Sequence, residues 1–283
     1  RQRLLEILVE RALGLGVRVE FESEIESTDA VRADLIVACD GVNSPIRELR
    51  REQFQTHVVV GRNKYIWLGT TRVFDAFTFA FVHTEAGWIW CHAYGFDGDT
   101  STFIAECSPE TWTGLGFDRL DEPDTIRRLE QIFERHLQGH ALKSKARTRE
   151  RAAWLEFRTV TNATWHADNI ALMGDAAHTT HFTIGSGTRL ALEDAISLAA
   201  TLQNETSLAT ALERYETERR RALLRTQSDA RLSARWFESV PRYIDLAPPK
   251  VFALMTERRS PLLPRIPPSA YYQLYRATQS NAA

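Results

Sequence analysis

The stretch "NIALMGDAAHTTHFTIGSGTRLALEDA" constrains the fold more than any other part of the sequence. Its apolar run 170–173 predicts a buried strand, which Gly174 and Asp175 end. A glycine-bearing loop follows, and residues 188–202 are typical of a helix. Strand, loop and helix in this order predict an α/β fold, and such folds bind ligands at the carboxyl ends of their strands.

The loop carries groups suited to a nucleotide or a flavin. The carboxylate of Asp175 can accept two hydrogen bonds from a ribityl or ribose diol. Gly185 and Gly187 precede the helix, so their amides form its positive end, which favours a phosphate or the pyrimidine edge of a reduced flavin. On these residues alone, a purely structural strand-loop-helix connection is the less favoured alternative. The phosphate fingerprint GxGxxG is absent, because "GSGTRL" has Leu190 at the third glycine position.

A second apolar run, "ADLIVACDG", predicts a parallel strand buried on both faces. Asp40 and Gly41 end this strand. Asn43, Ser44 and Arg47 then offer an amide, a hydroxyl and a guanidinium for phosphate or ribose oxygens. Taken singly, this motif is better explained as a turn that Asp40 caps and in which Gly41 supplies a positive φ.

Between residues 58 and 107 the pattern changes to alternating segments separated by glycine and aspartate turns, which predicts an antiparallel sheet. Alternation in the segment 87–96 places its large side chains on one face, and such a face either packs against a helix or lines an apolar pocket. These side chains are Trp88, Trp90, His92, Tyr94 and Phe96.

Further elements are expected on both sides of this sheet. Periodicity predicts a helix at the start of the chain, a strand over 17–25, and helices over 121–137 and 207–240. The basic run in the last helix is interleaved with glutamates, so a solvated, salt-bridged face is expected. The proline-rich tail 241–283 is expected to be irregular and to wrap the body.

Composition excludes several classes of function. The chain has 283 residues, a formal net charge of -2 and a pI near 6.5, which argues against nucleic acid as a partner. Its three cysteines lack metal-ligand spacing, so no metal site is expected, and they fit a reducing compartment. No apolar run is long enough to span a membrane, and a cytoplasmic location is expected.

Together, "DLIVACDGVNSPIRE" and "ALMGDAAHTTHFTIGSGTRLALEDA" resemble the Asp-Gly and Gly-Asp motif pair of the single-component FAD-dependent aromatic hydroxylases, the group of para-hydroxybenzoate hydroxylase. The segments "WLGTTRVFDAFTF" and "FDGDTSTFIAECSPETW" look most like its salicylyl-CoA and anthraniloyl-CoA hydroxylase branch. The resemblance implies hydroxylation of an aromatic substrate, expected to be an aryl-CoA thioester, with NAD(P)H and O2 through a flavin C4a-hydroperoxide.

The fold implied is α/β (α+β mixed). A Rossmann-like, three-layer FAD-binding domain would occupy 1–56 and 150–240, an inserted antiparallel-sheet substrate domain 57–149, and the tail 241–283. The family's N-terminal βαβ unit with its GxGxxG fingerprint is missing, so the FAD-binding domain is expected to be N-terminally truncated.

The resemblance also implies roles for single residues. Asp175, after Gly174, would bind the flavin ribityl chain, and Gly185, Ser186, Gly187 and Thr188 would lie under the pyrimidine edge of the isoalloxazine. Asp40, Gly41 and Arg47 would serve the pyrophosphate region and the NAD(P)H encounter.

His92 and His181 are the candidate catalytic residues, as hydrogen-bond partners of a ring substituent or as bases, and for each a packed or solvent-facing histidine is the simpler alternative. His178 is expected to hold the loop. Two other functions stay open. One is an indole or tryptophan hydroxylase of the same family, and the other is a non-catalytic remnant with an incomplete flavin site.

Overall fold

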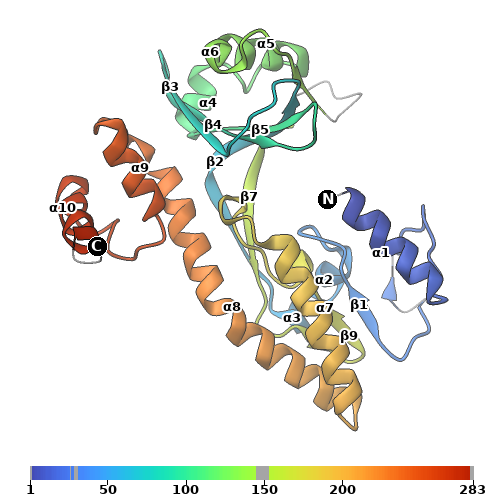
Figure 1. The fold of residues 1–283 in the computed structure, drawn as a ribbon. Helices are drawn as coiled ribbons and strands as arrows, with labels where there is room; N and C mark the ends of the chain where they lie inside the picture. Colours follow the sequence, from blue (N-terminus) through green and yellow to red (C-terminus); the bar gives the residue numbers. More distant parts are fainter. Residues whose placement is uncertain (1, 26, 29–30, 145–152, 281–283) are drawn as a thin grey trace.

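The computed structural model describes residues 2–25, 27–28, 31–144 and 153–280. Two sheets, one small and one large, are joined by long strands, and two long helices run beside them (Figure 1). The expected boundary at residues 149 and 150 lies outside the described residues. In the part of the chain that the structure describes, no helix is both long and apolar enough to cross a membrane.

The small sheet contains the two strands that end in the Asp-Gly and Gly-Asp motifs. Strands β1 (Ile36–Ala38) and β9 (Ile170–Leu172) pair in parallel, and β8 (His166–Ala167) pairs antiparallel with β9. Helices α7 (Gly187–Asn204) and α8 (Leu208–Glu238) pack together beside this sheet (Figure 1). The buried hydroxyl of Tyr215 on α8 donates a hydrogen bond to the Leu172 carbonyl at 3.0 Å. The mixed α/β class and both predicted helices are confirmed.

Two expectations near the start of the chain are wrong. Helix α1 (Gln2–Gly14) forms as expected, but residues 17–25 are not a strand. Their apolar members Val17, Phe21 and Ile25 are exposed, and no described strand pairs with this segment, so its backbone lacks a ladder partner. Strand β1 is parallel, but it is not buried on both faces, because Val37 is 36% exposed.

The large sheet is antiparallel, as predicted, and has the strand order β3-β4-β5-β2-β6, with β7 paired to β2. Its strands are β2 (His57–Thr70), β3 (Thr78–Thr84), β4 (Gly87–Gly95), β5 (Ser101–Cys107), β6 (Leu142–Lys143) and β7 (Leu155–Thr161). One face packs on α4 (Pro109–Gly114), α5 (Glu122–Ile132) and α6 (Glu134–Leu137) through a core that includes Ile66, Phe103 and Phe133. The single helix expected over 121–137 is therefore interrupted at Phe133.

Strand β2 runs from the large sheet toward the part of the molecule that contains the small sheet and helix α7 (Figure 1). The part from Lys64 to Thr70 pairs with β5. The part from His57 to Val60 pairs with β7, as do Lys64 and Tyr65. The β2–β7 register shifts between Val60 and Lys64, so the ladder is irregular there. Helices α2 (Pro45–Leu49) and α3 (Arg51–Phe54) lead from β1 into β2.

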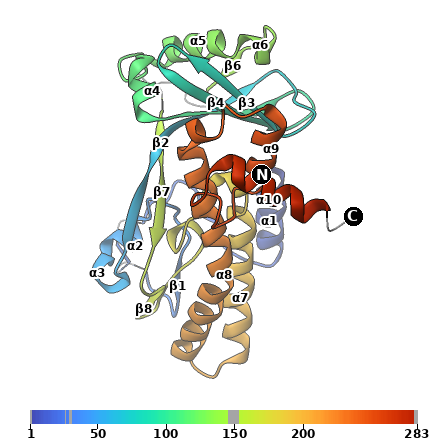
Figure 2. The same cartoon turned by 90° about the vertical axis from the view of Figure 1, so that its left-hand side faces the viewer.

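The C-terminal tail is not irregular, contrary to expectation. It forms a 3-10 turn (Val240–Arg242) and the helices α9 (Pro248–Thr256) and α10 (Pro268–Ser280). Both helices begin at a proline, because that residue suits the first helical turn, where no backbone donor is needed. The tail packs with the end of α8 on the aromatic face of β3 and β4, as Figure 2 shows, around Trp90 and Trp236.

Candidate cofactor and substrate site

A buried ionic cluster holds the Gly-Asp turn in place. Gly174 has a φ of +59°, a left-handed conformation that favours glycine, and its N–H donates to Asp194 at 3.1 Å. The same fully buried carboxylate accepts from Nε2 of His178 at 2.8 Å and from Nε of Arg219 at 2.7 Å. Burial alone would raise the pKa of Asp194, but the hydrogen bonds and charge of His178, with the bond from Arg219, lower it. His178 therefore holds the loop, as expected.

Asp175 lies where the turn meets the start of α7. It is exposed, and a Cβ atom placed on Gly187 would lie 4.0 Å from its Oδ1 atom. Gly185 has a φ of +64°, and Ser186, the residue before α7, makes no side-chain cap bond to the helix. Instead, its hydroxyl contacts that of Thr180 at 3.1 Å. A carboxylate and an uncapped helix start are thus brought side by side. Thr188 is exposed within the first turn.

The Asp-Gly motif is followed by an arginine that links it to the Gly-Asp turn. Asp40 accepts a hydrogen bond from the Ile46 N–H at 3.2 Å, and Gly41 turns the chain with a φ of +87°. The guanidinium of Arg47 is buried and donates to the Ala176 carbonyl at 2.9 Å and to the Val42 carbonyl at 2.7 Å. Arg47 thereby crosslinks the two motifs. Its predicted pyrophosphate role, and those of Asp40 and Gly41, stay predictions.

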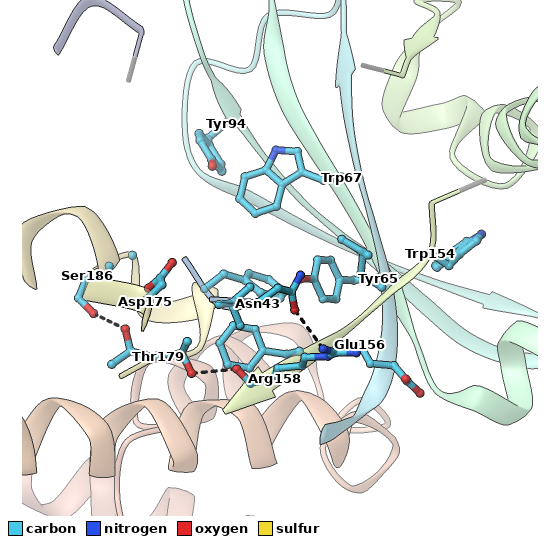
Figure 3. Close-up of a pocket in the computed structure, with 17 residues that line it drawn as sticks. Asn43, Tyr65, Trp67, Tyr94, Trp154, Glu156, Arg158, Asp175, Thr179 and Ser186 are labelled. Carbon is cyan, nitrogen blue, oxygen red and sulfur yellow. Dashed lines mark hydrogen bonds between the residues drawn. The ribbon is translucent and has the colours of Figure 1, made fainter. Parts of the chain in front are cut away.

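A cavity of about 550 Å³ opens above these motifs (Figure 3). One wall consists of Asp175, Gly185, Ser186 and Gly187, and the facing wall consists of aromatic side chains from the large sheet, namely Tyr65, Trp67 and Tyr94. A volume of this size suits a fused ring system with a small ligand, and the mixture of aromatic walls and few polar groups is typical of such sites.

Phe182 and Arg158 also line the cavity. The ring of Phe182 lies 5.0 Å from that of Tyr65 and 6.2 Å from that of Trp67. Arg158, from β7, donates to the Asn43 side chain at 3.0 Å across the cavity wall (Figure 3).

His92 does not line this cavity. It is 1% exposed, and its Nε2 contacts the buried carboxylate of Glu106 at 2.9 Å, while Phe182 packs edge-on against its ring at 5.5 Å. Glu106 also accepts from Asn63 and Trp90. Burial would raise the pKa of Glu106, but the hydrogen bond and charge of His92 hold it below its usual value. Direct contact of His92 with a ligand in this cavity would therefore require Phe182 to move.

His181 does not line this cavity either. Its ring packs on Phe157 at 4.5 Å, and its Nδ1 contacts the Thr183 hydroxyl at 2.9 Å. Burial, the largest cause, lowers the pKa of His181 to about 4. The ring is therefore neutral at pH 7 and is a weaker base than an ordinary histidine.

We expect the pH dependence of the protein's stability to reflect the lowered pKa of His181. The pKa of His181 is about 4 in the folded protein and about 6.5 when unperturbed, so the unfolded chain binds more protons between these pH values. Stability is therefore fully present above pH 6.5 and is lost as pH falls toward 4. Urea unfolding should show a smaller loss over this range for His181→Gln than for the wild type. A variant of the exposed His57, His57→Gln, should behave like the wild type, and equal losses in all three would contradict the assignment.

Several lining residues were not found from the sequence. Tyr65 and Trp67 share a face of β2, and strict alternation over 64–70 could have identified them. Arg158 lies on β7, a strand that the sequence analysis did not predict. Asp194 lies inside a well-predicted helix, where nothing distinguishes it from a solvent-exposed residue.

Parallel strands that end in glycine turns and a helix start beside a carboxylate are the features of an α/β protein with a nucleotide-type cofactor site, and here an aromatic cavity adjoins them. Residues 3–228 match the family described as FAD binding domain. The chain belongs to this family, which confirms the resemblance drawn from the two motifs, and FAD is the cofactor of the family.

Characterised relatives agree with this assignment. The chain is 37% identical over 254 residues to salicyloyl-CoA 5-hydroxylase of a Streptomyces species, covering 86% of this chain and 48% of the relative. It is 38% identical over 241 residues to 3-hydroxy-4-methyl-anthranilyl-[aryl-carrier protein] 5-monooxygenase of Streptosporangium sibiricum, covering 85% of this chain and 63% of that protein. The chain thus spans about half to two-thirds of the length of these relatives.

The fold also matches a solved structure. A variant of 2-methyl-3-hydroxypyridine-5-carboxylic acid oxygenase superposes with a TM-score of 0.64 at 21% identity, covering 84% of this chain and 66% of that chain. This likeness concerns the fold, and it confirms the mixed architecture with an inserted antiparallel sheet.

The residues present fit the ribityl and pyrimidine part of FAD. The carboxylate of Asp175 and the first turn of α7 lie together on one wall of the cavity, as a polyol chain and an electron-rich ring edge would require. The groups that would grip the pyrophosphate are less evident, because the guanidinium of Arg47 is already bonded to two carbonyls.

Proposed function

We propose that this chain forms the ribityl side of the FAD site and the aromatic substrate wall of an NAD(P)H-dependent monooxygenase that hydroxylates an aryl thioester. The observation that carries the proposal is the cavity in which Asp175 and the start of α7 face Trp67 and Tyr94. Both relatives with the highest identities quoted above act, by their names, on aryl groups linked to CoA or to a carrier protein. We place the protein in the cytoplasm, where NAD(P)H is available.

Each wall of the cavity has its own task in this proposal. Asp175 accepts hydrogen bonds from the polyol of the cofactor, and the N-terminal end of α7 stabilises negative charge on the pyrimidine edge. Trp67 and Tyr94 hold the substrate ring by stacking, and Phe182 keeps water from the reacting atoms. FAD, when bound and reduced by NAD(P)H, would supply the activation of O2, one atom of which goes to the ring and the other to water.

The buried pair of Glu106 and His92 positions the sheet behind Phe182 in this arrangement. An ionised Glu106 can accept hydrogen bonds but cannot donate them, so Nε2 of His92 is the donor. This hydrogen bond fixes the orientation of the His92 ring. His92 and His181 therefore act through the packing of Phe182, with His181 neutral at pH 7.

Product analysis tests the proposal. The full-length protein should turn over NAD(P)H and hydroxylate salicylyl-CoA, with little product from free salicylate or from tryptophan. Hydroxylation of tryptophan in place of the thioester would favour the indole alternative. A protein that retains no flavin absorbance and forms no hydroxylated product with any of the three would favour the non-catalytic remnant and overturn the proposal.

A further inference from the structure

A second cavity of about 540 Å³ lies on the other side of β7, between the β2–β7 ribbon and α8. Figure 2 shows α8 beside this ribbon. Phe157 and Thr179 line both this groove and the aromatic cavity, so the two cavities lie back to back across these residues. The ring of Phe157 packs on that of His181 at 4.5 Å between the two cavities, so a ligand that extends from one into the other would have to displace this ring.

The groove is positively charged. Arg62, Arg231 and Arg235 line it, and the acidic residue among its lining is Glu238. One oxygen of Glu238 already accepts a hydrogen bond from the Arg62 backbone N–H at 2.9 Å. The guanidinium of Arg62 is bonded to Glu110 at 2.7 Å, which lies outside the groove. The charge of the groove is therefore not balanced by its own walls.

Arg231 and Arg235 are the strongest sign of a ligand. Both are exposed, lie four residues apart on one face of α8 and form no ion pair with any residue that the structure describes. Two like charges at this spacing repel each other. Elsewhere on the same helix, Arg214, Arg219 and Arg220 are paired with carboxylates, so the expectation for the basic run holds for Arg219 and Arg220. Arg221 and Arg225 have no ion pair among the described residues, but they line neither cavity. An anion in the groove would supply the missing partner.

We propose that this groove binds the phosphate-bearing end of a coenzyme A thioester whose aryl group occupies the aromatic cavity. The inference rests on the proposed function, since both cavities must then serve one substrate. Guanidinium groups form bidentate hydrogen bonds with phosphate oxygens. Arg231 and Arg235 have no ion pair among the described residues, and Arg62 could contact a phosphate only by giving up its bond to Glu110. A carrier-protein arm has a single phosphodiester, so the charge of the groove favours the free coenzyme.

Binding of coenzyme A itself, without an aryl group, tests the groove separately from any reaction. Titration calorimetry on the full-length protein should detect binding that weakens as salt is added. The double variant Arg231→Ala/Arg235→Ala should weaken it by at least roughly tenfold, the effect of losing about 1.4 kcal/mol. Pantetheine, which has no phosphate, should bind far more weakly than coenzyme A. The control Arg221→Ala removes an exposed arginine of α8 that has no ion pair among the described residues and lines neither cavity, and it should leave binding unchanged.

Three results would overturn the inference. They are equal affinity of the double variant and the wild type, equal affinity for pantetheine and coenzyme A, or binding of a phosphopantetheinylated carrier protein without binding of coenzyme A. None of these outcomes depends on hydroxylation. If the wild type hydroxylates salicylyl-CoA and the double variant does so with unchanged KM, the proposed function stands and the groove assignment fails. If coenzyme A binds as expected but no aromatic compound is hydroxylated, the proposed activity fails and the groove assignment stands.

Discussion

Replacing Asp194 with alanine should destabilise the protein by about 3–5 kcal/mol, the typical cost of removing one partner of a buried ion pair. Arg219 is 8% exposed and would lose its shortest carboxylate contact, at 2.7 Å. The N–H of Gly174 and Nε2 of His178 would lose their acceptor at the same time. Urea unfolding followed by circular dichroism measures the loss.

Its neighbour Glu193 gives the matched control. Glu193 also contacts Arg219, at 3.1 Å, but it is more than a third exposed, so water screens the pair. We expect Glu193→Ala to cost about 1 kcal/mol or less. If Asp194→Ala were no more destabilising than Glu193→Ala, the buried cluster would not be what holds the Gly-Asp turn.

Replacing Asp175 with alanine should weaken FAD binding by roughly 10- to 100-fold, because a hydrogen bond to a charged group contributes about 1.5–3 kcal/mol. Stability should change little, since the side chain is exposed. Quenching of flavin fluorescence during titration of the full-length protein measures the affinity. The exposed Asp99, in the turn between β4 and β5, provides the control, and Asp99→Ala should bind FAD like the wild type. Equal affinity of Asp175→Ala and the wild type would remove Asp175 from the cofactor site.

The fold class, the helices α7 and α8 and the antiparallel sheet were predictable because each has a strong periodic pattern over many residues. Residues 17–25 show the limit of that method. Their alternation is real, but a strand forms only where another strand supplies hydrogen bonds, and none of the described strands does so. The prediction for the tail 241–283 was wrong because its prolines were interpreted as breaks, although two of them begin helices α9 and α10.

The parts of the site formed by residues close together in sequence were predictable, and the parts formed by contacts between distant segments were not. Asp175, Gly185 and Gly187 lie close together in sequence, and the structure brings them onto one cavity wall. Arg47 and His92 were assigned to ligands by residue type. Their burial against Ala176 and Glu106 depends on contacts between distant segments, which a single sequence does not reveal. The aromatic wall of Tyr65 and Trp67 depends in the same way on the register of β2 against β5.

Strand β2 also limits how the large sheet can move relative to the part of the molecule that contains the small sheet. Domains joined by a loop can rotate freely, but here the continuous strand β2 is hydrogen-bonded to β5 along one part and to β7 along another. Any opening between the wall that contains Asp175 and the aromatic wall must therefore bend the β2–β7 ribbon. The flexing costs fewest hydrogen bonds between Val60 and Lys64, where the ladder is already irregular. This irregular stretch includes Gly61 and Arg62, which line the charged groove. A ligand bound in the groove would therefore restrict the bending of the ribbon.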